Sequence, residues 1–130
     1  MSNRLAERVS AFEARVGGRG AHVENLADKT LPFGLSAPIL DSLRLVFSQF
    51  PDIDRVLVYG SRARGDFRPH SDIDLAVLAP RMETSDFSRL WMALDDLPIV
   101  FRLDVSLHHD VADSQLKHNM LAEGVTLYQP

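Results

Sequence analysis

The sequence predicts an α/β fold in which a small sheet is covered by helices. Three stretches rich in β-branched or large apolar residues, 55–59, 73–78 and 99–107, are typical of strands. Apolar residues recur at helical spacing before and between them, over 36–50 and 85–96. A chain of 130 residues that is 45% hydrophobic can bury one core of ordinary size, so we expect a single globular domain.

The remaining elements follow from local signals. Apolar residues at positions 5, 9, 12 and 16 predict a helix over residues 3–16, which a glycine-rich stretch ends. Ser36 is a candidate N-cap for the helix over 36–50, and Pro51 follows the end of that helix. We expect a last helix over 111–122, ended by Gly124 before a short apolar tail.

Composition excludes several classes of protein. A formal charge of −4 argues against strong nonspecific binding of nucleic acid, which depends on phosphate contacts. The absence of cysteine excludes disulfides and thiolate metal sites. The first residues carry charges throughout, without a stretch of signal-peptide or membrane-spanning length, so we expect a cytoplasmic protein that does not enter a membrane.

Two carboxylates separated by one residue, Asp72 and Asp74, lie at the predicted strand over 73–78. Side chains two apart on a strand point to the same face, with Cα atoms roughly 6.6 Å apart, so these two should converge while Ile73 and Leu75 face the core. Two ionised carboxylates this close repel, and a divalent cation or a bound proton would relieve the repulsion. Such oxygen ligands suit magnesium or manganese.

A third carboxylate, Asp104, interrupts the apolar run over 99–107. If that strand neighbours the strand of Asp72 and Asp74, three acids share one site. The alternative is structural: Asp72 caps its strand, and Asp74 and Asp104 lie at an exposed margin of the sheet. The pair of acids alone does not decide between the two.

The turn after the first predicted strand is the second indication of a site. Gly60 follows that strand directly and residues 61–64 can begin a short helix, so the N–H groups of Gly60 and Ser61 would face out of the sheet end, where phosphate can bind. Neither a Walker P-loop nor a dinucleotide fingerprint is present. A tight turn would explain Gly60-Ser61 alone, but with two acids one strand later the stretch describes a cradle for a metal-bound triphosphate.

The motifs Gly60-Ser61-x-x-Arg64-Gly65 and Ser71-Asp72-x-Asp74-Leu75 together resemble the signature of the DNA polymerase β-like nucleotidyltransferase superfamily. They are most similar to its minimal nucleotidyltransferases (MNT proteins), which pair with HEPN proteins. The resemblance covers residues 33–128. It implies a mixed sheet flanked by helices, in a nucleotidyltransferase domain over 33–130. The N-terminal residues fall outside the resemblance, and we expect residues 1–32 to form a helical extension because of their apolar spacing.

The resemblance assigns roles to the acids and to the turn. Asp72 and Asp74 are expected to bind two magnesium ions, with manganese as an alternative, and Asp104 to complete the catalytic and metal site. Gly60 and Ser61 are expected to hold the phosphates of the nucleotide.

Three further residues are candidates for nucleotide binding: Arg62, Arg64 and Ser71. An arginine in a surface turn is more often solvated or paired with a local acid such as Asp66, and Ser71 also suits a role in shaping the turn into Asp72.

The resemblance implies transfer of a nucleoside monophosphate, AMP from ATP, to a hydroxyl on a partner protein. That partner would be a HEPN-type protein, either a toxin, which makes this chain the antitoxin component of a toxin–antitoxin pair, or a substrate-binding subunit. A homo- or hetero-oligomer is compatible with either arrangement. The alternative is a non-catalytic nucleotide-binding subunit that neutralises or supports a HEPN partner by direct binding. Intact acids favour the enzyme, and the short chain favours a partner under both interpretations.

Overall fold

The computed structural model describes residues 31–130. The helix predicted over residues 3–16 lies outside the described residues, and the proposed boundary of the N-terminal extension stays a prediction.

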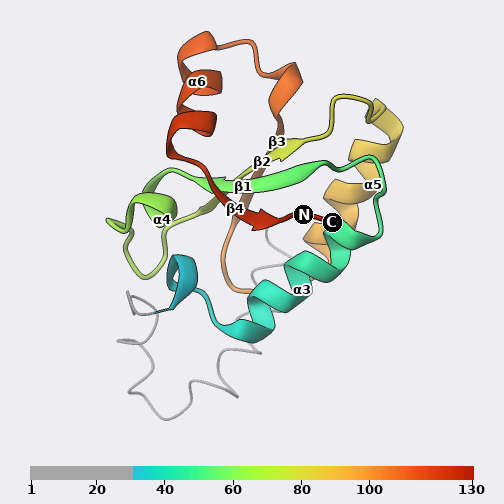
Figure 1. Ribbon diagram of the computed structural model, residues 1–130. Helices are drawn as coiled ribbons and strands as arrows, with labels where there is room; N and C mark the ends of the chain where they lie inside the picture. The colour runs from blue at the N-terminus through green and yellow to red at the C-terminus, as the bar shows by residue number, and fades with distance from the viewer. Residues whose placement is uncertain (1–30) are drawn as a thin grey trace.

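The centre of the domain is a four-stranded mixed sheet with the strand order β3-β2-β1-β4 (Figure 1). The strands are β1 (Arg55–Tyr59), β2 (Ile73–Leu78), β3 (Leu103–Leu107) and β4 (Val125–Tyr128). Strand β1 pairs antiparallel with both β2 and β4, whereas β2 and β3 run parallel. The predicted α/β fold, a small mixed sheet flanked by helices, is therefore confirmed.

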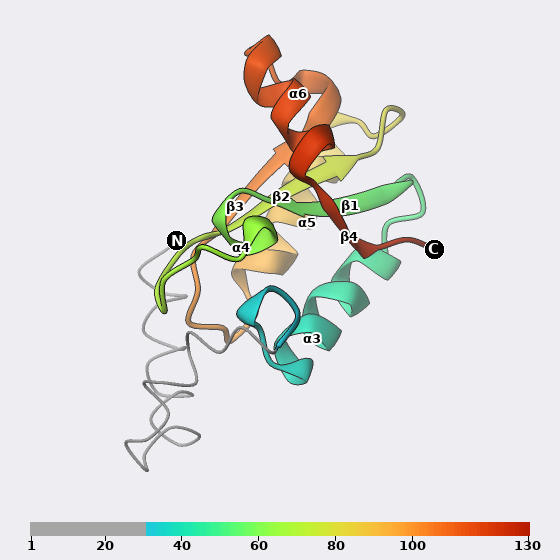
Figure 2. The ribbon, with the colours of Figure 1, turned by 60° about the vertical axis from the view of Figure 1, so that its left-hand side comes forward.

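Helices cover both faces of this sheet. Helices α3 (Ala37–Ser48) and α5 (Thr84–Asp95) lie on one face, and α6 (Ser114–Glu123) lies on the other (Figure 2). Alternate residues of the strands face the two sides, because successive side chains of a strand point in opposite directions. The larger core, on the side of α3 and α5, contains the buried strand residues Val56, Val58, Ile73, Leu75 and Val77. The smaller core, beneath α6, contains Leu57, Tyr59, Ala76 and Met120.

Short helical elements complete the fold at the two ends of the sheet. The 3₁₀ helix η1 (Pro32–Gly34) precedes α3, and the short helix α4 (Ser61–Arg64) follows β1, as the sequence predicts. A second 3₁₀ helix, η2 (His108–Asp110), follows β3. Ser36 is the N-cap residue of α3, although its side chain donates or accepts no capping hydrogen bond there.

Two predicted elements differ from the structure. The third strand begins at Leu103 rather than at residue 99, because Ile99 and Phe101 are buried as parts of a loop that packs on the core without strand pairing. The last helix begins at Ser114 rather than at 111, because the Asp113 side chain caps it by accepting hydrogen bonds from the N–H groups of Gln115 and Leu116.

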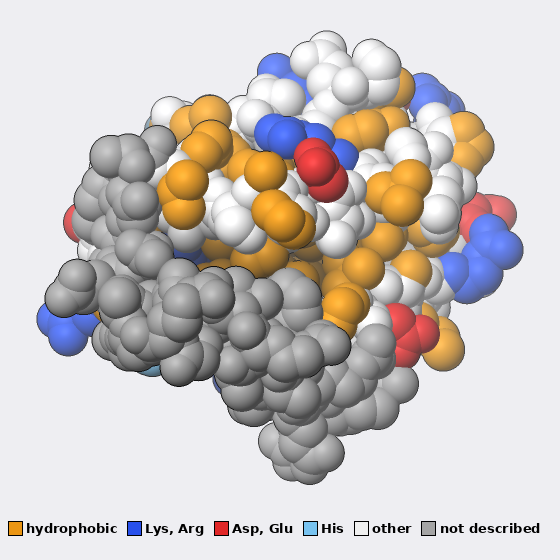
Figure 3. All heavy atoms as spheres, turned by 90° about the horizontal axis from the view of Figure 1, so that it is seen from below, with side chains coloured by type: hydrophobic (Ala, Val, Ile, Leu, Met, Phe, Trp, Pro, Cys, Tyr) orange, Lys and Arg blue, Asp and Glu red, His pale blue; other side chains and the backbone are white. Residues whose placement is uncertain are grey.

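The surface mixes apolar and charged side chains. Figure 3 shows the side that lies below in Figure 1, where apolar groups lie beside charges of both signs. Leu45 on α3 and Met92 on α5 are the most exposed large apolar residues described, at 64% and 60%, and such isolated side chains are ordinary on protein surfaces. Within residues 31–130, no helix has the length and apolar character needed to cross a bilayer.

Candidate active site

The turn between β1 and α4 passes directly over the carboxylate of Asp74. Gly60 has a φ of 73° and a ψ of −152°, a backbone conformation that glycine adopts readily and other residues rarely do. A Cβ atom on Gly60 would lie 2.5 Å from Oδ2 of Asp74. The Gly60 carbonyl accepts hydrogen bonds from the N–H groups of Ala63 (3.1 Å) and Arg64 (3.0 Å), which closes the first turn of α4. Glycine is thus required here twice, for the conformation and for the close approach.

The two acids of the Asp-x-Asp motif lie as the strand period predicts. Asp72 is exposed just before β2 and Asp74 is half-buried within it, while Ile73 and Leu75 are fully buried between and after them. The two carboxylates therefore share the face of the sheet opposite α3 and α5.

Asp104 joins them from the neighbouring strand. In the parallel β2–β3 ladder, Asp104 is the direct partner of Asp74. The condition set by the sequence, that these two strands be neighbours, is met. Asp72, Asp74 and Asp104 come together at one end of the sheet, beside the Gly60 turn.

The three carboxylates at this end of the sheet affect one another's ionisation, because like charges close together repel. Burial, the largest cause, and the charges of Asp104 and Asp72 together raise the pKa of Asp74 to about 6, against the opposite effect of Arg64 and Arg62. Ionising Asp74 in the folded chain is therefore unfavourable without a compensating cation.

Tyr59 belongs to the same cluster, and sequence reasoning missed it. It is the strand partner of Asp74 on β1 and is 8% exposed. Burial raises the pKa of Tyr59 to about 12, with Asp104 and Asp74 adding to the rise and a hydrogen bond with Ser106 opposing it. The signal that could have found Tyr59 is its place as the last strand residue before Gly60, but its contact with the acids depends on the strand register.

The acids fit a divalent cation that arrives with its nucleotide. Their oxygen ligands are the kind that magnesium and manganese prefer. Within residues 31–130, no group of three acidic or histidine side chains is arranged as a ready-made metal site. Magnesium commonly keeps several waters and is held by one or two carboxylates plus substrate phosphates. Asp72 and Asp74 are the residues placed to supply those carboxylates.

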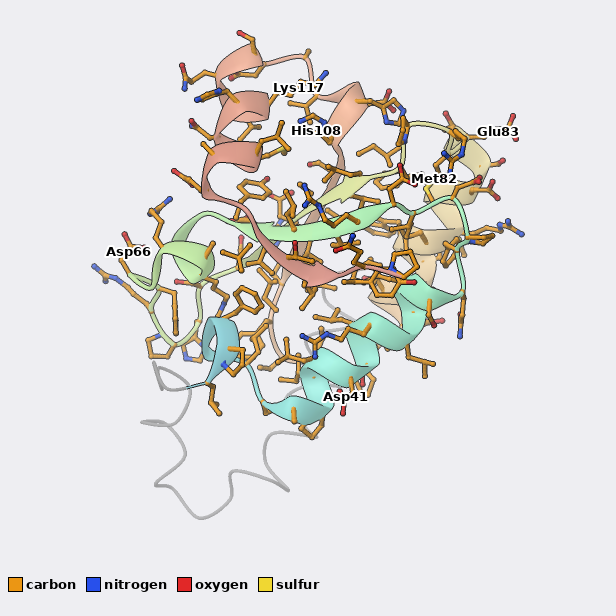
Figure 4. The ribbon with its side chains drawn as sticks, in the orientation of Figure 1. Asp41, Asp66, Met82, Glu83, His108 and Lys117 are labelled. Atoms are coloured by element: carbon orange, nitrogen blue, oxygen red, sulfur yellow. The ribbon has the colours of Figure 1, made fainter. Side chains whose placement is uncertain are left out.

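The two arginines of the α4 turn have different surroundings. Arg64 is exposed and pairs with Asp66 (Nε to Oδ2, 3.3 Å) and with Glu123 (Nη1 to Oε1, 3.2 Å). Asp66 lies at the outer end of the turn after α4, away from the sheet (Figure 4). The alternative expected for a surface arginine, pairing with Asp66, is thus realised for Arg64.

Arg62 is neither solvated nor paired with Asp66. It is 2% exposed, and its guanidinium donates to backbone carbonyls, including that of Ser71. Burial lowers the pKa of Arg62 to about 10, although Asp72 and Asp74 act in the opposite direction, so the side chain stays charged at neutral pH. This geometry gives Arg62 a place inside the fold and does not support the expected contact with a nucleotide.

The two candidate serines, Ser61 and Ser71, also have different surroundings. Ser71 shapes the turn into Asp72, because its Oγ accepts a hydrogen bond from the Arg68 N–H at 2.8 Å. Ser61 is half-buried at the start of α4, and its carbonyl accepts from the N–H groups of Gly65 (2.9 Å) and Asp66 (3.2 Å). Gly60 therefore lies beside Asp74 and Ser61 follows it at the start of α4, whereas Ser71 acts on the backbone that leads into Asp72.

Comparison with known families assigns this arrangement. The sequence matches the family described as "Polymerase beta, Nucleotidyltransferase" over residues 41–130, a stretch that contains both motifs and all three acids. The chain belongs to this family, whose members transfer nucleotidyl groups and generally use nucleoside triphosphates and divalent metal ions. No curated protein was found to match the chain closely enough to serve as a relative.

Proposed function

We propose that this chain is a magnesium-dependent nucleotidyltransferase that transfers AMP from ATP to a hydroxyl group on a partner protein. The observation that carries the proposal is the pairing of Asp104 with Asp74 in the β2–β3 ladder, beside the Gly60 turn. That pairing brings a third carboxylate to the Asp-x-Asp motif from an independent part of the sequence.

The residues divide into a nucleotide side and an acceptor side. Gly60 and Ser61 bind the phosphates, with the Ser61 hydroxyl donating to a charged phosphate oxygen. Asp72 and Asp74 hold the metal that accompanies the triphosphate, which neutralises charge that develops on the phosphates. Asp104, exposed at the edge of the cluster, accepts the proton of the acceptor hydroxyl. The hydroxyl oxygen bonds to the α-phosphorus, the bond to the β-phosphate oxygen breaks, and pyrophosphate leaves.

The identity of the acceptor rests on the resemblance of the motifs to MNT proteins. We propose a HEPN-type protein as the partner, with this chain as the antitoxin-type component of the pair. Asp72 and Asp104 are exposed, so a hydroxyl group on a separate protein could reach them from solvent, which supports a partner protein as the acceptor.

A non-catalytic nucleotide-binding subunit is the second candidate, because the Gly60 turn, Asp72 and Asp74 would hold a nucleotide and its ion without any contribution from Asp104. A protein that only binds a nucleotide with its ion, and transfers nothing to an acceptor, would need no third carboxylate.

Labelled ATP distinguishes the two candidates. The chain is incubated with a co-purified HEPN-type partner, magnesium, and ATP labelled either at the α- or at the γ-phosphate. Nucleotidyl transfer labels the partner from α-labelled ATP only and raises its intact mass by one or more AMP groups. The Asp72→Asn/Asp74→Asn double variant is the matched control and should leave the partner unlabelled. A partner that is inhibited but carries no added mass would favour the binding subunit and overturn the enzymatic proposal.

A further inference from the structure

Arg62 is a buried cation that directly follows Ser61, on the nucleotide side of the site. It belongs to α4, and its side chain is among the largest fully buried ones of residues 31–130. A buried charge is unfavourable unless its donors are satisfied, so the contacts of this guanidinium determine what it does.

The guanidinium holds the backbone immediately before Asp72. Its Nε and Nη2 atoms donate to the carbonyl oxygen of Ser71 at 3.1 and 3.0 Å, which is a two-pronged contact to one acceptor. Nη2 also lies 3.5 Å from the Pro69 carbonyl oxygen. Because the Ser71 carbonyl belongs to the peptide bond that begins Asp72, movement of this contact would move the carboxylate of Asp72 directly.

The same guanidinium also contacts the segment that leads to Asp104. Its Cζ atom lies over the rings of Phe67 and Phe101, at 4.7 and 4.5 Å from their centroids. Phe101 precedes β3, and the carbonyl of the next residue, Arg102, accepts a hydrogen bond from the Ile73 N–H at 2.9 Å. The start of β3 is therefore fixed against both Arg62 and the start of β2.

The loop before α3 is shaped around this arginine. Nη1 of Arg62 donates to the Phe33 carbonyl at 2.9 Å, and Phe33 adopts a φ of 58°, which is uncommon for a residue other than glycine. A Cβ atom on Gly34, whose φ is 71°, would lie 2.3 Å from Cζ of Phe67 and 3.1 Å from Nη1 of Arg62. Glycine is thus needed where η1 approaches the stacked guanidinium.

Only arginine suits these contacts among the basic residues. Its planar fork can donate to several carbonyls while the guanidinium packs against aromatic rings. Lysine would keep the charge but offers a single ammonium group, and an apolar residue would leave the carbonyl of Ser71 without these two donors.

We propose that Arg62 is a positioning residue for the metal-binding carboxylates, which acts by holding the Ser71–Asp72 peptide and the start of β3. The inference rests on the proposed function. It differs from a direct role in nucleotide binding, because the guanidinium donors are directed at carbonyls of the chain itself. The effect of losing Arg62 should therefore appear in the magnesium requirement rather than in the contact with the nucleotide.

The test measures the magnesium concentration that half-saturates ATP binding. The proteins are wild type, Arg62→Met, Arg62→Lys and the control Arg89→Met, whose arginine is an exposed residue of α5 paired with Asp86. Each is measured by calorimetry below its own unfolding temperature, with folding checked by circular dichroism. ATP affinity is measured again at saturating magnesium.

We expect the half-saturating magnesium concentration to rise roughly 10–100-fold in Arg62→Met, the usual effect of losing a group that orients a metal ligand. Arg62→Lys should show a smaller rise, the control none, and saturating magnesium should restore ATP affinity in both Arg62 variants. If Arg62→Met does not fold, a several-fold rise in Arg62→Lys supports the inference and an unchanged value refutes it.

Three other results would overturn the inference. A lower unfolding temperature with an unchanged magnesium requirement would make Arg62 purely structural. Weaker ATP binding that saturating magnesium does not restore would make it a nucleotide contact. Wild type without magnesium-dependent ATP binding would refute the proposed function and this inference together.

Discussion

Replacement of Asp74 by asparagine should stabilise the metal-free protein at neutral pH. In the folded chain, burial and the charges of Asp104 and Asp72 raise the pKa of Asp74 from its ordinary value of 3.8 to about 6. The folded state therefore binds more protons than the unfolded state between those two values, and stability falls as pH rises through that window. Above pH 6 the full unfavourable effect of the ionised carboxylate is present, and a neutral asparagine removes it.

The magnitude follows from the size of the pKa change. A rise from 3.8 to about 6 corresponds to about 3 kcal/mol if all of it is transmitted to folding. Asp74 is only half-buried, so solvent screening reduces this and we expect about 1–2 kcal/mol. For a domain of this size that gain raises the unfolding temperature by about 3–8 °C.

Urea unfolding followed by circular dichroism, with a chelator present, measures the difference between variant and wild type. The gain of Asp74→Asn should be full at pH 7.5 and should largely vanish near pH 3, where Asp74 is mostly protonated in both states of the wild type. Asp41→Asn is the control, since Asp41 is an exposed residue on the outer side of α3, across the sheet from the acids (Figure 4). Equal stability at pH 7.5, or the same gain at both pH values, would refute the electrostatic argument.

The other predictions concern the turn and the acceptor side. Gly60→Ala should weaken ATP binding strongly, because the added Cβ would meet Oδ2 of Asp74 at 2.5 Å. Gly65 also has a positive φ, but a Cβ there would meet nothing within 4 Å, so Gly65→Ala should lose stability and keep its ATP affinity. Equal ATP affinity of the two variants in calorimetry would contradict this prediction. Ser61→Ala should lose one hydrogen bond to a charged phosphate, roughly 1.5–3 kcal/mol of ATP affinity, and an unchanged affinity would remove Ser61 from the site. Asp104→Asn should retain much of the ATP binding yet lose transfer of α-label by orders of magnitude, and normal transfer would show that Asp104 does not act on the acceptor.

Local patterns in the sequence were enough to place the two acids of the motif on one face of a strand. The strand period depends only on neighbouring residues, so the shared face of Asp72 and Asp74 and the burial of Ile73 could be predicted. The short helix after Gly60 and the strand over 55–59 were also correct, since turn and strand signals there are local.

Features that depend on distant contacts could not be predicted in the same way. The pairing of Asp104 with Asp74 could be stated only as a condition, because strand register is set by the whole sheet. The stretch 99–102 has the composition of a strand, but its apolar residues serve a buried loop. Arg62 looked like a surface residue of a turn, since one of its acceptors, the carbonyl of Phe33, lies 29 positions away in the sequence.

Magnesium-dependent ATP binding tests the central claim most directly, because it requires Asp72, Asp74 and the Gly60 turn to form one site. Calorimetry compares wild type with the Asp72→Asn/Asp74→Asn variant, each titrated with ATP in magnesium and in a chelator. We expect binding by wild type in magnesium only, and none by the double variant, which should fold at least as stably because like-charge repulsion is relieved. Equal ATP affinity in the two proteins would contradict the assignment of this site, and so would a wild-type affinity that is the same in magnesium and in chelator.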